Sequence, residues 1–210
     1  CMPARYGDDL ASELGEAQAF VPCSKEDDIV EVLAGVLGDA APHASTPADA
    51  QSPWAASPAS YVKISDGCDR FCSFCAIPYI RGRYHSFPLE TVRASVAERV
   101  EAGVREITLI AQDTGRWGED FDESSNTAVL LATLADEFPQ TWFRLMYIEP
   151  QGVSDELLDV IASKPNVCKY LDMPLQHASK PVLRAMNRRG DENSHRELVA
   201  RIRERVPGIT

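Results

Sequence analysis

Hydrophobic and polar residues alternate in a regular way from about residue 60 to the end of the chain. Short apolar runs predict strands at 61–64, 106–111, 142–148 and 167–172. Apolar residues at helical spacing predict helices at 88–102, 127–137, 154–163, 179–187 and 194–205. Strands that alternate with helices are typical of parallel βα units. We therefore predict an α/β fold whose parallel sheet curls into a partial βα barrel.

The beginning of the chain follows a different pattern. Residues 26–37 predict a helix, and the acidic residues of its first turn suit the helix dipole. Residues 39–57 are rich in Ala, Ser and Pro, which predicts a linker because such a stretch buries little apolar surface. We therefore expect three parts: the end of one domain at 1–38, this linker, and a larger domain at 58–210.

Polar groups follow each predicted strand at its carboxyl end. Because these ends of parallel strands meet at one edge of the sheet, we expect the groups to converge on one mouth. They are Asp66 with a cysteine-rich loop, Gln112 with Asp113, Glu149, and Gln176 with His177.

Most of these residues also have a plainer interpretation. Asp113 or its neighbour Thr114 could cap a helix instead of lining a site. His177 fits a hydrogen-bonded loop histidine as well as a ligand contact. We interpret Glu149 as a turn residue before Pro150.

The cysteine-rich loop carries the sharpest signal in the chain. Cys68, Cys72 and Cys75 have the spacing C-x3-C-x2-C. Three thiolates can hold three corners of a four-iron cluster and leave the fourth iron open for a ligand. A structural zinc site normally has four ligands, and the nearest further candidate, His85, lacks pair spacing. A disulfide would leave one thiol over, so the spacing favours the cluster.

Aromatic and basic side chains lie close to these cysteines. Phe71 and Phe74 stand between the ligands, where they either keep solvent off the sulfur atoms or pack into the core. Arg81 and Arg83 follow the loop and could meet an anionic partner, although we expect at least one to be solvated. Cys168 lies among apolar residues, so we predict that it belongs to the core.

Charge and composition exclude several classes of protein. The net charge is −11, and residues 1–60 hold ten acidic residues against two basic ones. We therefore expect no direct nucleic-acid binding, and we interpret the arginines between 184 and 205 as a solvated helix face. No apolar run approaches the roughly 20 residues that span a bilayer, and no signal peptide is visible. Six unevenly clustered cysteines favour metal binding in a reducing cytoplasm.

Residues 66–82 resemble the cysteine loop of the radical S-adenosylmethionine (SAM) methylthiotransferases. The runs at 111–114, 170–179 and 182–189 resemble the branch of this family that modifies an aspartate β-carbon in small-subunit ribosomal protein twelve. The tRNA-modifying branch looks more like Gln-Ser-Gly-Ser where this chain has Gln176-His177. The resemblance thus favours a protein substrate, with a tRNA methylthiotransferase and a non-catalytic electron-transfer or zinc module as alternatives.

The resemblance implies a set of cofactors. Cys68, Cys72 and Cys75 would hold a [4Fe-4S] cluster whose open iron binds SAM, and a donor such as flavodoxin or ferredoxin would supply the electron that cleaves SAM. We expect the SAM or substrate site to be lined by Gln112, Asp113, Gln176 and His177. No residue is assigned a catalytic role.

A second cluster is implied at the other end of the chain. The run Cys1–Tyr6 resembles a run in the family's smaller α/β N-terminal domain, where the cysteine is the last of three ligands to an auxiliary [4Fe-4S] cluster. That cluster would supply the methylthio group. We therefore expect residues 1–38 to be the end of that domain, and the chain to be a fragment that lacks both ends of a cytoplasmic enzyme.

Overall fold

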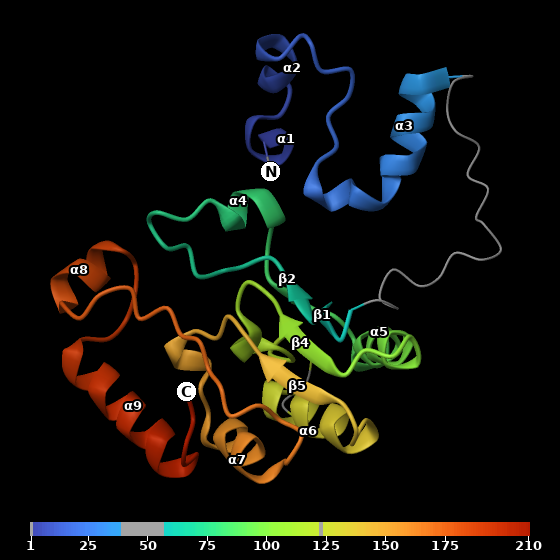
Figure 1. Ribbon diagram of the computed structural model, residues 1–210. Helices are drawn as coiled ribbons and strands as arrows, with labels where there is room; N and C mark the ends of the chain where they lie inside the picture. The colour runs from blue at the N-terminus through green and yellow to red at the C-terminus, as the bar shows by residue number, and fades with distance from the viewer. Residues whose placement is uncertain (1, 39–56, 122–123) are drawn as a thin grey trace.

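The computed structural model describes residues 2–38, 57–121 and 124–210 (Figure 1). Three predictions from the sequence fall on residues outside these ranges. They are the Cys1 ligand, nearly all of the predicted linker at 39–57, and the division of domains that this linker implies.

The centre of the fold is a parallel sheet. Strands β1 (Ala59–Lys63), β4 (Glu106–Ile110) and β5 (Trp142–Leu145) lie in the order β1-β4-β5. Val62 pairs with Leu109, and Leu109 pairs with Leu145, so the strands run in parallel and in register. The central strand β4 is buried on both faces, as its continuous apolar run predicts, whereas β1 and β5 alternate between buried and more exposed residues.

The prediction of a regular fourth strand at 167–172 is wrong. Only a parallel bridge between Phe143 and Val167 joins this segment to the edge of β5. Beyond it, the backbone of Thr210 bonds to Lys169 and Leu171, so residues 167–171 lie between β5 and the end of the chain. The parallel α/β arrangement is confirmed, and the predicted fourth strand is reduced to a single bridge.

All five helices predicted after residue 60 are present. They are α5 (Leu89–Glu101), α6 (Thr127–Glu137), α7 (Asp155–Ser163), α8 (Lys180–Ala185) and α9 (Glu192–Arg205). Side-chain caps fix three of their starts, at Asn126, Ser154 and Asp191. Helix α9 begins two residues earlier than predicted because Asp191 and Ser194 form a reciprocal capping box.

The hydrophobic core lies between the sheet and helices α5, α6 and α7, which lie to the right of and below the strands in Figure 1. Its fully buried side chains include Ile107, Leu109, Leu130, Leu134 and Phe143. Cys168 is 6% exposed, which confirms that it belongs to the core. Turns η3 (Thr114–Arg116) and η4 (Pro150–Gly152) follow β4 and β5 and meet through their glycines.

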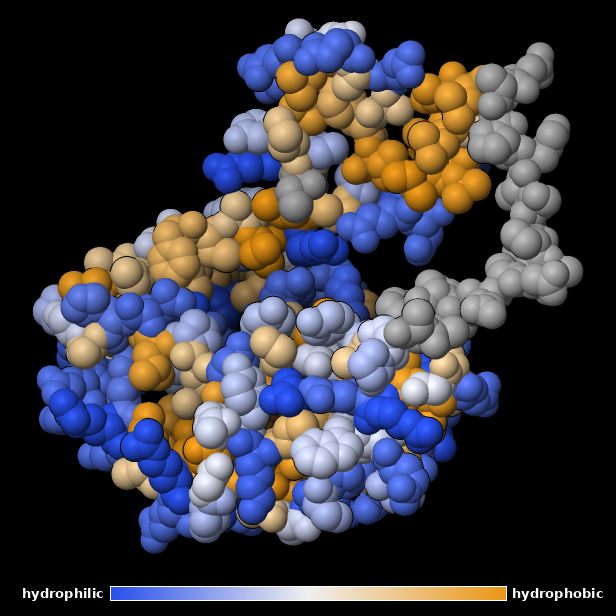
Figure 2. All heavy atoms as spheres, viewed as in Figure 1, coloured by the Kyte–Doolittle hydropathy of each residue, from blue (hydrophilic) through white to orange (hydrophobic). Residues whose placement is uncertain are grey.

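The N-terminal segment consists of helices in its described part. They are α1 (Met2–Tyr6), α2 (Asp9–Glu13), the 3-10 helix η1 (Cys23–Asp28) and α3 (Ile29–Leu37). The predicted helix at 26–37 is therefore divided, and Lys25 adopts a non-helical backbone before it. Most apolar side chains of α3 are exposed, and they form an orange patch at the upper right of Figure 2. No helix in the described ranges is both long and apolar enough to cross a membrane.

Candidate active site

The cysteine loop is closed at its base by a small antiparallel pair. Strand β2 (Ser65–Asp66) enters the loop, and β3 (His85–Ser86) leaves it and pairs back with β2. Gly67 makes the turn into the loop with φ +73°, and a Cβ at this position would lie 2.1 Å from the carbonyl oxygen of Arg83. The amide of Cys68 then donates to the carbonyl of Gly82 at 3.2 Å. Only glycine fits this entrance without displacing the opposite side of the loop.

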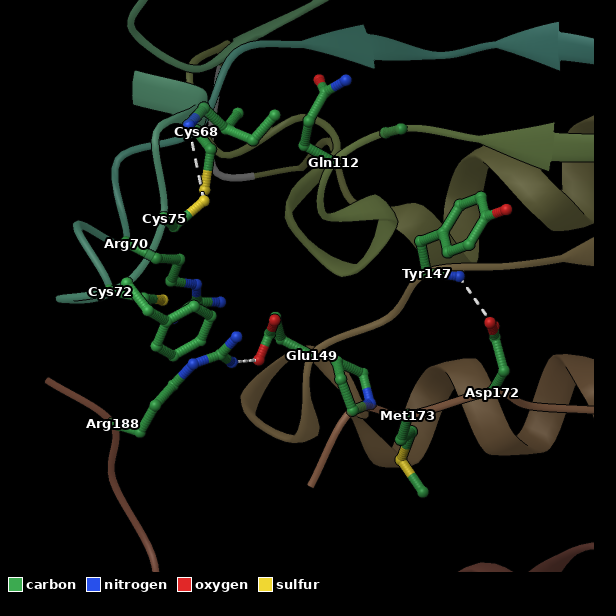
Figure 3. Close-up of a pocket in the computed structure, with 14 residues that line it drawn as sticks. Cys68, Arg70, Cys72, Cys75, Gln112, Tyr147, Glu149, Asp172, Met173 and Arg188 are labelled. Carbon is green, nitrogen blue, oxygen red and sulfur yellow. Dashed lines mark hydrogen bonds and ion pairs between the residues drawn. The ribbon is translucent and has the colours of Figure 1, made fainter. Parts of the chain in front are cut away.

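The three cysteines of the loop line one cavity of about 540 Å³ (Figure 3). All three thiols are free; Cys68 and Cys72 are buried, and Cys75 is half-buried. Burial raises the pKa of the Cys68 thiol above its ordinary value. The amide of Ile77, at the start of α4 (Ile77–Arg81), donates to the Cys75 sulfur at 3.4 Å.

The three thiols do not converge on a single-ion site in this structure. Within the described ranges, no three His, Cys, Asp or Glu side chains gather closely enough to hold one ion. A four-iron cluster is much larger than one ion, so its thiolate ligands stand farther apart. The choice of the cluster over zinc stays a prediction from the cysteine spacing.

The ends of two strands form the far wall of the cavity. Gln112 follows β4, and Tyr147 and Glu149 follow β5. The Oε1 atom of Gln112 is buried and has no hydrogen-bond partner. An unpaired buried acceptor is costly, so a ligand with a donor group at this place would satisfy it. Gln112 thus lies where the sequence predicted it, at the cavity.

A chain of alternating charges supports this wall. Arg70, in the cysteine loop, contacts Oδ2 of the fully buried Asp113, with Nε at 2.9 Å and Nη2 at 2.8 Å. Oδ1 of Asp113 accepts from the backbone amide of Glu149 at 3.4 Å. The Glu149 carboxylate in turn pairs with Arg188 (Figure 3). Burial raises the pKa of Asp113, and the Arg70 guanidinium acts in the opposite direction.

Two interpretations from the sequence are corrected here. Glu149 is not a plain turn residue: it is 6% exposed, lines the cavity and faces Arg188. The reason is that β5 ends early, because Tyr147 adopts a left-handed backbone (φ 62°) and its amide bonds to Asp172 at 2.7 Å. The capping alternative for Asp113 is also wrong, since its side chain makes no cap bond to η3.

Gln176 and His177 do not reach this cavity. They line a separate groove of about 770 Å³ against α9, so the expectation of a single mouth is wrong for this pair. The residues that follow Asp172 and line the cavity are Met173 and Pro174. Short backbone turns then lead the chain away from the cavity toward α9. A contact of Gln176 or His177 with cofactor or substrate stays a prediction.

The aromatic residues of the loop are not core residues. Phe71 is 39% exposed and Phe74 is 57% exposed, so the packing alternative is wrong. Phe74 borders the cavity, and Phe71 lies under the guanidinium of Arg83 at 5.3 Å. Arg83 is itself mostly solvated, whereas Arg81 pairs with Asp66 and Glu26.

Sequence reasoning assigned no role in the site to Arg70, Tyr147 or Arg188. Arg70 stands within the cysteine loop, so its position was the available signal. Tyr147 lies at the cavity because its backbone is left-handed, and Arg188 lies there because it pairs with the distant Glu149. Neither feature has a local sequence pattern.

Comparison with known proteins decides the family. The profile of the radical SAM superfamily matches residues 62–210. The chain belongs to this superfamily. The superfamily implies a [4Fe-4S] cluster and SAM, and the residues present fit both groups. Three free thiols and one unpaired buried acceptor face the same apolar cavity.

Curated relatives resemble the chain along its whole length. The ribosomal protein uS12 methylthiotransferase RimO of Trichlorobacter lovleyi is 40% identical over 227 residues, which cover 100% of this chain and 49% of the relative. The protein of the same name from Geobacter sulfurreducens is 40% identical over 220 residues, with 100% and 48% covered. The chain thus spans about half the length of the curated relatives it matches.

Solved structures show the same fold at low sequence identity. The radical SAM methyltransferase TsrM of Kitasatospora setae, with cobalamin and a [4Fe-4S] cluster bound, has a TM-score of 0.56 and 15% identity. The match covers 70% of this chain and 27% of that one. This radical SAM domain therefore has the parallel α/β architecture of its superfamily.

Proposed function

We propose that the chain is the catalytic part of a radical SAM methylthiotransferase that modifies an aspartate β-carbon in ribosomal protein uS12. The observation that carries this proposal is 40% identity to RimO enzymes over the whole chain. The cysteine-lined cavity agrees with it, because it offers a cluster site beside a ligand-sized space of about 540 Å³.

In this proposal Cys68, Cys72 and Cys75 hold the [4Fe-4S] cluster. When bound, the cluster leaves one iron open to SAM and supplies the electron that cleaves it. The protein fixes the positions of the thiolates and keeps water out. Cys68 and Cys72 are 9% and 8% exposed, and apolar groups such as Ala111, Met173 and Pro174 border the space beside them.

Gln112 is the residue we propose for direct contact with SAM. Its buried Oε1 lacks a donor, and the amino groups of SAM are donors. Asp113 acts behind this wall, where its pairing with Arg70 fixes the cysteine loop against the end of β4. Glu149 and Arg188 add a buried ion pair to the same wall. Gln176 and His177 remain candidates for a contact with the substrate.

The remaining assignments concern the whole enzyme. We propose that Cys1 is one of three ligands to an auxiliary [4Fe-4S] cluster, the source of the methylthio group. Residues 1–38 then belong to the preceding domain, 39–57 to the linker and 58–210 to the catalytic domain. The electron donor is a flavodoxin or ferredoxin, the compartment is the cytoplasm, and neither membrane nor nucleic acid is a partner of this segment.

The proposal is tested on the full-length protein after anaerobic reconstitution. A uS12 peptide that contains the target aspartate and a tRNA are incubated in parallel with SAM and reductant, and each is analysed by mass spectrometry. We expect one methylthio group on the aspartate and none on the tRNA. Modification of the tRNA alone would support the sister activity. A colourless zinc protein that does not cleave SAM would contradict both and indicate a non-catalytic module.

A further inference from the structure

The turn that follows helix α8 is fastened to the cysteine loop. The side-chain amide of Asn187 donates to the carbonyl oxygens of Arg70 at 3.2 Å and Phe71 at 3.0 Å. One residue earlier, the carbonyl of Met186 accepts from the amide of Ser73 at 3.2 Å. Three hydrogen bonds therefore join segments that lie more than 110 residues apart in the sequence.

These bonds engage the backbone between the cysteines. The two carbonyls that Asn187 binds lie between Cys68 and Cys72, and Ser73 lies between Cys72 and Cys75. Phe71 also adopts a left-handed backbone (φ 48°), which costs energy for a bulky residue and persists only where the surroundings hold it. The Asn187 amide is one of the groups that hold Phe71 in this conformation.

The position of Asn187 suits asparagine in two respects. Its own backbone is left-handed (φ 56°), a conformation that asparagine tolerates better than most residues. Its amide nitrogen has two hydrogens, one for each carbonyl oxygen. Glycine would accept the backbone but could not donate, and aspartate would place a carboxylate against two carbonyl oxygens.

The same turn reaches the cavity wall through its next residue. Arg188 pairs with Glu149, and the Arg188 amide donates to the carbonyl of Leu183 at 2.7 Å, which closes the end of α8. The turn at 186–188 is thus also anchored to the end of α8 and to the cavity wall.

We propose that Asn187 is a positioning residue for the cluster ligands. Its amide holds the backbone between Cys68 and Cys72, so that their thiolates keep the spacing that a cluster requires. This inference rests on the proposed function only in that the loop holds a cluster. The two hydrogen bonds of the Asn187 amide are a property of the polypeptide, and their effect on the loop can be measured without any metal.

The test compares Asn187→Gly with Asn187→Asp in the full-length protein. Both variants keep a residue that tolerates the left-handed backbone, and both remove the donor. Gln140→Glu is the control, since it makes the same amide-to-acid type of change at an exposed turn between α6 and β5. The first readout is hydrogen exchange of the Ser73 amide, the loop amide that donates to Met186, in the metal-free protein. The second is the electron paramagnetic resonance spectrum of the reduced, reconstituted protein with and without SAM.

We expect loop exchange to become about tenfold faster in both Asn187 variants, the change that loss of one or two hydrogen bonds produces. The amides of α5 and α6 should keep their rates, and the spectrum and its response to SAM should change. Loop exchange within twofold of the unmodified protein in either variant would overturn the proposal, as would equal acceleration throughout the fold. If the unmodified protein itself takes up no cluster, the proposed function fails, but the effect of Asn187 on loop exchange can still be measured.

Discussion

Arg70 and Asp113 form an ion pair that joins the cysteine loop to the end of the central strand β4. Both contacts go to the same carboxylate oxygen, with Nε at 2.9 Å and Nη2 at 2.8 Å. The Asp113 side chain is fully buried, whereas that of Arg70 is 28% exposed. The loop for which we propose the cluster is thus tied to the central strand of the sheet.

Asp113→Asn should lower the free energy of unfolding. The change leaves the Arg70 guanidinium beside a neutral amide, and we expect a loss of about 2 kcal/mol, reduced from the value for a fully buried pair because Arg70 reaches solvent. Urea unfolding followed by circular dichroism measures it. Asp136→Asn, which breaks the exposed pair with Lys164, is the control and should cost less than about 1 kcal/mol. Equal losses in the two variants would contradict the structural role of Asp113.

Gln112→Leu should separate ligand binding from stability. The leucine removes a buried acceptor that has no partner in the protein, so the free energy of unfolding should stay the same or rise slightly. SAM should bind about tenfold more weakly, because its donor loses this acceptor. Equilibrium binding of SAM to the reconstituted protein provides the measurement. Unchanged SAM affinity in a folded variant would exclude Gln112 from the site.

Gly67→Ala should damage the entrance of the cysteine loop. The new Cβ would meet the Arg83 carbonyl at 2.1 Å, in a left-handed backbone of φ +73°. We expect a loss of at least about 2 kcal/mol in unfolding free energy and poorer uptake of iron. Gly103→Ala is the matched control, because its φ is +93° but its surroundings are open. It should cost about 1 kcal/mol, and a larger effect there than at Gly67 would refute the argument from close approach.

Asp191 makes the start of helix α9 sensitive to acid. Hydrogen bonds from the Ser194 backbone and side chain lower the pKa of Asp191 below its ordinary value. A carboxyl whose pKa is lower in the folded state stabilises the fold above its unfolded pKa, of about 3.9, and loses that contribution as the pH falls through the folded pKa. Exchange of the first-turn amides of α9 should therefore accelerate below about pH 4.

Asp191→Asn is the reference for this acid effect, because asparagine also caps helices but does not titrate. The difference between the two proteins should be constant above about pH 5 and change only below it. A difference that is constant down to pH 2 would show that the cap does not depend on the charge of Asp191.

The helices could be predicted from the sequence more accurately than the strand ends or the site. Thr127–Glu137 has its predicted bounds because Asn126 caps it and its apolar spacing is regular. Strand β5 ends earlier than predicted because Tyr147 adopts a left-handed backbone, which the residue type does not predict. The cysteine spacing predicted that Cys68, Cys72 and Cys75 lie together, and they line one cavity. The contacts of Asn187 and of Arg188 with Glu149 depend on how distant segments fold together, and no local pattern encodes them.

The central claim is that Cys68, Cys72 and Cys75 hold one [4Fe-4S] cluster with an open iron. Iron analysis of the anaerobically reconstituted full-length protein measures it most directly, with Cys72→Ala compared with the core variant Cys168→Ala. We expect Cys72→Ala to lose about four irons per chain and the resonance signal that responds to SAM, and Cys168→Ala to keep both. Full iron content and an unchanged SAM-dependent signal in Cys72→Ala would contradict the account.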